Sequence, residues 1–259
     1  MDPLELAATL TEETVFTIAL VFTRIGAVAS LLPGFGEQNM PARIRLVVAL
    51  AFTTLTWPLV APLVPDLPSD WGQIMPLFLT EAFIGVMLGL AIRMMVLVLQ
   101  LAGSIAAQAT SLSQIMGAGA TPDPLPAIGN ILVIAGLALV LVTGLHIKAV
   151  SAVAESYRVL PFALFPPPSD IATWGVSQVA HAFSLAFTLS APFVVASFAY
   201  NITLGVINRA MPQLMVAFIG APAITAAGIL ILFLAAPVIL LAWNIRMDTV
   251  LSDPFGTRP

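Results

Sequence analysis

Residues 74–102 read IMPLFLTEAFIGVMLGLAIRMMVLVLQLA, an apolar run whose only charges are Glu81 and Arg93. A helix needs ~20 apolar residues to cross the ~30 Å hydrocarbon layer of a bilayer, and it must be a helix because backbone groups find no water there. The run exceeds this length and carries too little charge to form the surface of a soluble protein. It therefore predicts a membrane-spanning helix.

The composition of the whole chain points the same way. Of its 259 residues, 59% are hydrophobic and 8% are charged, against ~45–50% and ~25% in soluble domains. The 9 Lys and Arg and 13 Asp and Glu cannot cover a water-soluble globule of this size. The lack of cysteine excludes disulfides and thiolate metal sites, and a net charge of −4 argues against nucleic-acid binding. The sequence predicts an integral membrane protein.

Apolar residues gather in six blocks, and helix is expected for each of them. The blocks are Thr14–Leu32, Leu46–Val64, Ile74–Ala102, Ala127–Ile147, Trp174–Ile207 and Gln213–Trp243. The 34 residues of the fifth block would run ~50 Å as a straight helix. Pro192 in that block, with Pro222 and Pro237 in the sixth, predicts kinks or breaks. The expected fold is an all-α membrane protein of about six long, partly proline-broken helices.

Charged residues inside the apolar blocks are few, and each costs ~2.5–3.5 kcal/mol at a helix centre. They are Arg24, Glu81 and Arg93, and His181 is a further ionisable group. Glu81 and Arg93 lie ~18 Å apart along one helix and cannot pair with each other, so their partners belong to other helices or chains. We favour such pairing over a proton relay, which needs several ionisable groups in register.

Motifs of enzymes and metal sites are missing from the sequence. Ser104 has no G-x-S-x-G context, and neither His146 nor His181 stands in an H-E-x-x-H motif. We therefore expect no catalytic, metal-binding or cofactor-binding residue, and a protein that is not an enzyme.

Two glycine-containing segments suggest specific roles. Gly85 and Gly89 are spaced to let another helix approach closely. Residues 103–130 contain S-L-S-Q-I-M-G-A-G-A-T-P-D-P-L-P at 111–126, which is apolar but too irregular for a helix. Such a segment must be buried in protein or line a cavity. Composition leaves a plug across a conduit and an ordinary re-entrant connector equally open.

Several local strings together resemble the FliR/SctT family of export-gate membrane proteins from bacterial type III secretion. Those near the start are Arg24-Ile-Gly-Ala, Pro33, Phe35-Gly36 and Pro41-Ala-Arg-Ile-Arg45. Those in the middle are Glu81, Gly85, Gly89, Gln100, Gly103, Asp123-Pro124, Gly144, His146, Ser156-Tyr157 and Pro161. Those near the end are Ala191-Pro192, Asn201, Gly205, Arg209, Pro212-Gln213, Gly220 and Pro222. The resemblance covers nearly the whole chain.

This resemblance implies a subunit of the flagellar or injectisome export gate. The family implies one copy of this chain joining several copies of FliP and FliQ in a helical, pore-forming cone, with FlhB near its entrance and FlhA as a further partner. Unfolded export substrates would pass through the pore, and lipid would surround it. The implied location is the bacterial inner membrane at the flagellar basal body, with much of the complex on the periplasmic side.

The resemblance also implies roles for parts of the chain. Residues 1–165 would be a FliP-like helical part, 170–245 a FliQ-like helical hairpin and 246–259 a short tail. A plug loop would lie near 114–121, formed by Ile115, Met116, Gly117, Ala118, Gly119 and Ala120. Pairing between helices or subunits is assigned to Arg24, Glu81, Arg93, Arg209 and Gln213, and helix packing to Gly85 and Gly89.

The alternative that the residues leave open is a small-solute transporter with a binding site at the bilayer midplane, built by broken helices. Such a transporter would carry matching breaks in its two halves. The expected breaks concentrate in the last two blocks, which favours the export gate.

Overall fold

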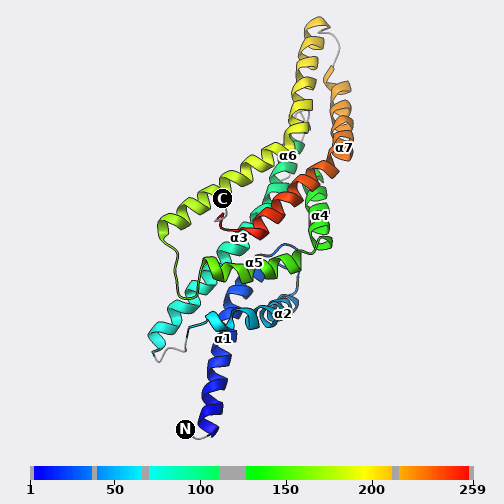
Figure 1. Cartoon of the computed structure of the whole chain (residues 1–259). Helices are drawn as coiled ribbons and strands as arrows, with labels where there is room; N and C mark the ends of the chain where they lie inside the picture. The colour runs from blue at the N-terminus through cyan, green and yellow to red at the C-terminus, as the bar shows by residue number, and fades with distance from the viewer. Residues whose placement is uncertain (1–2, 37–39, 66–69, 111–126, 212–215, 257–259) are drawn as a thin grey trace. The chain divides into compact units, whose positions relative to one another are not determined.

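The computed structural model describes residues 3–36, 40–65, 70–110, 127–211 and 216–256, and it is helical, with no strand within these ranges. Seven α-helices and one 3-10 helix are present in this part of the chain (Figure 1). They are α1 (Pro3–Leu31), α2 (Ala42–Val60), η1 (Ala61–Leu63), α3 (Trp71–Thr110), α4 (Ala127–Val142), α5 (Leu145–Val159), α6 (Pro168–Ala210) and α7 (Val216–Ser252). The predicted all-α membrane fold is confirmed.

Five of these helices are long and apolar enough to cross a bilayer. The pair α4 and α5 makes a sixth candidate span, but it is bent by 73° at the break. The sequence predicted one continuous block over Ala127–Ile147, and this was wrong. Gly144 adopts φ +86°, a left-handed conformation open to glycine at little cost, and it ends one helix and begins the next.

The prolines of the last two helices do not interrupt them. Pro192 lies inside α6 and Pro222 and Pro237 lie inside α7, and both helices are continuous by their hydrogen bonding. Both change direction along their length (Figure 1). A proline inside a helix removes one backbone donor and clashes with the preceding turn, which favours bends of this kind.

The chain forms two compact units that do not follow the sequence order. The first consists of Met1–Met94, Leu141–Gln178 and Met247–Pro259, and the second of Met95–Val140 and Val179–Arg246. The division predicted near residues 165–170 concerns resemblance to FliP and FliQ, which is a different property, and it stays a prediction.

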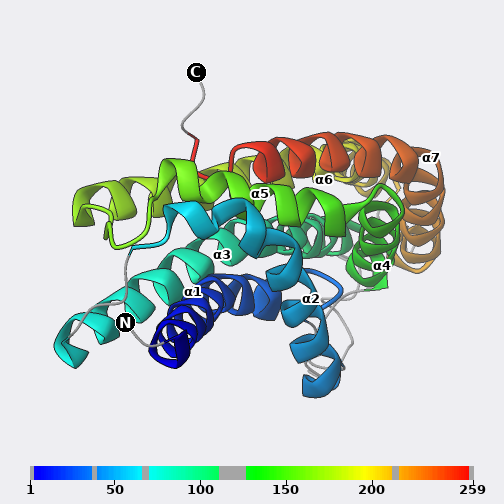
Figure 2. The same cartoon turned by 60° about the horizontal axis from the view of Figure 1, so that its bottom comes forward.

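The first unit is built around α1. Its core combines Phe16, Leu20, Val21, Ile25 and Val28 of α1 with Val60, Leu88, Val153, Tyr157 and Phe162. Helix α2 packs beside α1 (Figure 2). The chain end also belongs to this unit, because the indole N–H of Trp174 donates to the carbonyl of Pro254 at 3.0 Å. The core thus joins segments that are far apart in the sequence.

The second unit is held by Trp243, which is fully buried. Its indole N–H donates to the backbone carbonyl of Met95 at 2.7 Å, which ties α7 to α3. A Cβ on Gly136 of α4 would collide with the Leu99 side chain of α3 and would meet the Trp243 ring at 3.4 Å, so this glycine lets α4 lie close to α3 beside the ring. A tryptophan that is both packed and hydrogen-bonded fixes three helices at one point.

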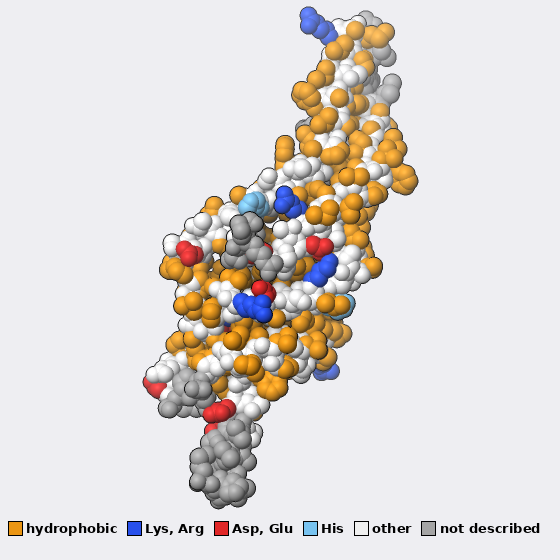
Figure 3. Space-filling model, viewed as in Figure 1, with side chains coloured by type: hydrophobic (Ala, Val, Ile, Leu, Met, Phe, Trp, Pro, Cys, Tyr) orange, Lys and Arg blue, Asp and Glu red, His pale blue; other side chains and the backbone are white. Residues whose placement is uncertain are grey.

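Much of the surface is apolar. Large exposed hydrophobic side chains occur on all seven α-helices of the described residues, and α5 contributes Ile147 and Val159. Hydrophobic side chains cover much of the face seen in Figure 3, with few charges among them. A surface of this kind is stable only against lipid or other apolar protein.

Candidate functional site

The strongest polar feature of the first unit is a buried ion pair between α1 and α3. Arg24 Nε donates to Glu81 Oε2 at 2.7 Å and Nη2 donates to Oε1 at 2.9 Å. Both side chains are 0% exposed. The parallel pair of bonds is the bidentate geometry in which a guanidinium matches a carboxylate.

Arg24 has further partners from a third part of the chain. Its Nη1 donates to Ser156 Oγ on α5 at 3.1 Å, and its Nη2 donates to the carbonyl of Leu160 at 3.1 Å. The guanidinium carbon lies 3.8 Å from the centre of the Tyr157 ring. Four hydrogen bonds and a stacked ring satisfy nearly all of the five donors of an arginine. We call Arg24, Glu81, Ser156, Tyr157 and Leu160 the Arg24 cluster.

The chemistry of the Arg24 cluster is that of a fixed structural pair. The Glu81 carboxylate accepts both of its bonds from Arg24, and neither side chain is open to solvent or substrate. A carboxylate held this way is badly placed to pass protons along a path. The pair instead removes two charges from an apolar interior by pairing each with the other.

The two predicted packing glycines, Gly85 and Gly89, follow Glu81 on α3 by about one and two helical turns. A Cβ on Gly85 would collide with the Arg24 carbonyl and come within 2.8 Å of the Ala27 Cβ. A Cβ on Gly89 would come within 2.8 Å of the Leu31 Cβ. Real Cβ atoms do not approach so closely, so α1 and α3 are in backbone contact here. The structure thus brings Arg24, Glu81, Gly85 and Gly89 together at one helix crossing.

The other predicted pairing residues lie elsewhere. Arg93 is half-buried on α3, ~18 Å along the helix axis from Glu81. Arg209 is exposed in the last turn of α6. Gln213 lies outside the described residues. Their pairing roles stay predictions.

The predicted plug residues Ile115, Met116, Gly117, Ala118, Gly119 and Ala120 also lie outside the described residues. The helices that flank residues 111–126 are described, and they meet in the second unit. A Cβ on Gly103 of α3 would collide with the Cα of Gly129 of α4. Ser197 of α6 donates its hydroxyl to the carbonyl of Ala109 at 2.5 Å, one residue before the end of α3. The ends of the helices on either side of this segment are therefore firmly held.

Sequence reasoning missed several functional contacts. Ser156 and Tyr157 entered only through the family resemblance, because a hydroxyl and a ring on a helix give no hint of an arginine 132 residues before the serine. Lys148 pairs with Asp248 at 2.6 Å in the first unit, although both are partly exposed. In the described residues no three His, Asp or Glu side chains converge in a way that could hold a metal ion.

Comparison with known proteins gives a consistent result. The family model described as "Bacterial export proteins, family 1" matches residues 15–250. A protein of Caulobacter vibrioides named "Flagellar biosynthetic protein FliR" is 34% identical over 238 residues, covering 92% of this chain and 95% of that protein. Proteins of the same name from Bacillus subtilis and Escherichia coli are 29% and 25% identical, covering 85% and 83% of this chain and 86% and 82% of their own.

Proposed function

The chain belongs to the bacterial export proteins of family 1, and on this basis we propose that it is a subunit of the flagellar type III export gate. In this proposal it assembles with FliP and FliQ homologues into a pore for unfolded export substrates. FlhB and FlhA are its further partners. The complex stands in the bacterial inner membrane at the flagellar basal body, with much of it on the periplasmic side.

The observation that carries this proposal is the match to flagellar proteins over nearly the entire chain. The 34% identity to the Caulobacter protein extends over 92% of this chain, so it is not confined to one helix or motif. A likeness of that extent reflects common descent of the whole fold. A shared role in flagellar assembly is its simplest reading.

The lengths of the last helices support an assembly of several chains. Helix α6 has 43 residues and α7 has 37, which correspond to ~65 Å and ~56 Å of helix. Both exceed the ~30 Å of hydrocarbon in a bilayer, yet they expose large apolar side chains such as Phe183, Phe198 and Phe233. Lipid alone cannot cover such lengths, whereas neighbouring apolar subunits can.

We infer a plug at residues 115–120. A pore wide enough for a polypeptide leaks ions when idle, so it needs a seal that can be displaced. Small residues around Met116 suit a seal that deforms without strong hydrogen bonds. Substrate opens this seal to the extent that it favours the open state. The chain supplies no chemical step, and energy coupling belongs to other parts of the machine.

The first experiment is native mass spectrometry of the tagged protein after mild detergent extraction from its host. The proposal expects one copy of this chain with several copies of two smaller membrane proteins. A stable homo-oligomer, or a folded lone chain, would refute it and return the transporter as the working hypothesis.

The plug is tested on the same purified complex in planar bilayers. Deletion of residues 115–120 should raise ion conductance, and Met116→Gly should raise it less because the loop keeps its length. Mass spectrometry of each variant confirms that the complex has assembled. Unchanged conductance in an assembled deletion variant rules out the plug but leaves the export-gate assignment intact.

A further inference from the structure

Helix α3 ends at Thr110 in the second unit, and both α6 and α7 contact its last turn. The Ser197 hydroxyl of α6 donates to the carbonyl of Ala109 at 2.5 Å. The Thr110 side chain lies against α7, since a Cβ on Gly228 would come within 2.9 Å of the threonine Cγ2. Three helices therefore meet at the point where α3 stops.

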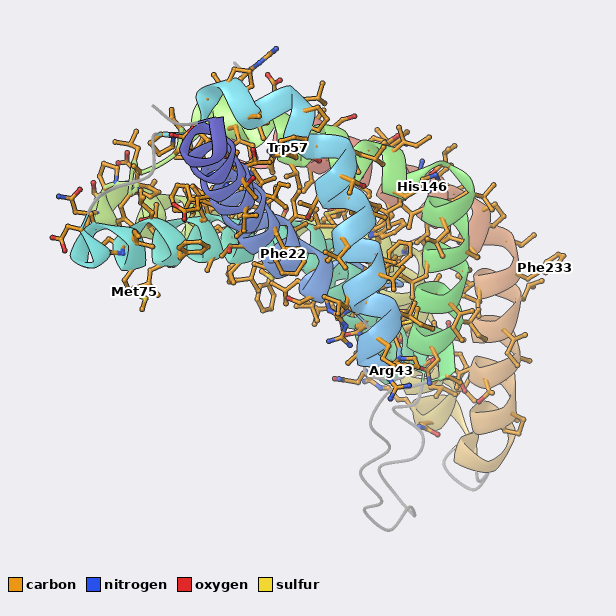
Figure 4. All side chains as sticks on the ribbon, turned by 90° about the horizontal axis from the view of Figure 1, so that it is seen from below. Phe22, Arg43, Trp57, Met75, His146 and Phe233 are labelled. Carbon is orange, nitrogen blue, oxygen red and sulfur yellow. The ribbon has the colours of Figure 1, made fainter. Side chains whose placement is uncertain are left out.

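Gly228 lies on the side of α7 that faces α3. Its missing side chain leaves room for Thr110, whose own Cβ would lie 3.3 Å from an added methyl. Five residues later, Phe233 is 77% exposed and points outward from α7 (Figure 4). Five residues turn a helix by ~140°. The glycine and the phenylalanine thus mark the inner and outer sides of this helix.

The end of α3 needs hydrogen-bond donors from outside its own backbone. The last four carbonyls of a helix have no partner within the helix, and leaving one unpaired away from water costs about as much as a lost hydrogen bond. Thr110 Oγ1 donates to the carbonyls of Ala106 and Ala107 at 3.1 and 3.2 Å. The carbonyl of Ala109 instead accepts its bond from α6, so the last turn of α3 is capped by another helix.

Ser197 does not follow the usual behaviour of a serine in a helix. Such hydroxyls commonly bond to a carbonyl three or four residues earlier, as Ser190 of α6 does with Phe187 at 2.9 Å. Ser197 is 4% exposed, and its hydroxyl bonds to α3 instead. The side-chain amide of Asn201 donates to the Ser197 oxygen at 3.4 Å, which leaves the serine hydrogen for Ala109.

The position of this helix end limits the reach of the chain that follows it. The plug proposed above starts at Ile115, five residues after Thr110, and five residues span at most ~18 Å. If the last turn of α3 unwound, its four residues would lengthen from ~6 Å of helix to at most ~14 Å of chain. A plug whose tether gains ~8 Å is no longer held near one place.

We propose that Ser197 is a positioning residue of the export pore, because it fixes the end of α3 from α6 and thereby sets the reach of the plug. The inference rests on the plug proposed above and adds the residue that holds its tether. It also gives the last two helices a part in sealing the pore, since both contact the end of α3.

Hydrogen exchange of the purified complex, followed by mass spectrometry, tests the anchor itself. Ser197→Ala should speed exchange of the backbone amides of residues 107–110 about fivefold, the factor that corresponds to one net hydrogen bond. The matched control is Ser190→Ala, because this buried serine bonds within its own helix and its loss should leave these amides unchanged. Equal exchange in the two variants overturns the proposal.

Ion conductance in planar bilayers tests the positioning role, after native mass spectrometry has confirmed assembly of each variant. Ser197→Ala should leak ions, though less than the deletion of residues 115–120, and Gly228→Ala should do the same by displacing Thr110 from α7. Gly205→Ala is the control for the second variant, since its methyl meets nothing within 4 Å, and it should not leak.

The two assays separate failure of the anchor from failure of the plug. Faster exchange without leakage in Ser197→Ala, in a complex whose 115–120 deletion does leak, overturns the positioning role and leaves the plug intact. A deletion variant that does not leak refutes the plug, and the positioning role falls with it. Neither result bears on subunit stoichiometry, so the export-gate assignment is judged separately.

Discussion

Replacing Glu81 by glutamine tests whether the Arg24 cluster holds the first unit together. The glutamine side chain keeps the size of the glutamate but loses its charge and one of its two acceptor oxygens. Arg24 then stays charged at 0% exposure, with its bonds to Ser156 and the Leu160 carbonyl intact. Its Nε–H or Nη2–H must meet an amide NH₂, which is also a donor.

The cost follows from leaving a buried charge uncompensated. Removing one partner of a buried ion pair destabilises a protein by about 3–5 kcal/mol. For a chain of this size, each kcal/mol lowers the melting temperature by about 2–4 °C. The Glu81→Gln variant should therefore melt roughly 6–20 °C below the parent protein.

The assay is the thermal loss of the monodisperse peak of the detergent-solubilised complex, followed by fluorescence-detected size exclusion. The control is Glu155→Gln, which removes a solvent-exposed pair with Arg158 and should shift the midpoint by about 2 °C or less. Replacing both Arg24 and Glu81 by methionine should recover most of the loss, because apolar residues of similar volume replace buried ion pairs at little cost. Equal melting of Glu81→Gln and Glu155→Gln would refute the reasoning.

Three further substitutions probe helix contacts. Gly103→Ala should destabilise the protein by about 3 kcal/mol, because the new methyl meets the backbone of Gly129, which has no flexible side chain to move aside. Gly175→Ala places its methyl in open space within α6 and should stabilise by about 0.5–1 kcal/mol in the same melting assay. Trp243→Phe removes the bond to Met95 and part of a fully buried ring, and should cost about 2 kcal/mol. A Gly103→Ala variant as stable as Gly175→Ala, or a Trp243→Phe variant that melts with the parent, would contradict these contacts.

The sequence predicted that these helices exist more accurately than it predicted the residues at which they begin and end. Block two was expected at Leu46–Val64, whereas α2 begins at Ala42, directly after Pro41. Hydropathy excludes Arg43 and Arg45 from an apolar block, but arginine is a good helix former and proline is common at the start of a helix. The sequence did not predict the break at Gly144 for a related reason. Hydropathy describes whether a side chain prefers an apolar environment, and it carries no information on the backbone torsion of the residue.

The charged cluster shows where sequence reasoning stops. The sequence identified Arg24 and Glu81 as charges within apolar blocks that need partners, because lone charges are costly in lipid. It could not pair them, since they are 57 residues apart and many arrangements of helices satisfy the same pattern. Only three-dimensional packing supplies that choice.

The Arg24 cluster also has a consequence for how the chain is made. Ribosomes add about 5–20 residues per second, so Glu81, 57 residues after Arg24, is synthesised about 3–11 s later. Ser156 follows later still. If α1 enters the membrane during this interval, its guanidinium has no carboxylate partner there, and the leucines, valines and phenylalanines of α1 must outweigh that cost on their own. Synthesis of α1 and closure of the pair are thus separate events in time, and Arg24 gains its carboxylate partner only once α3 has been made.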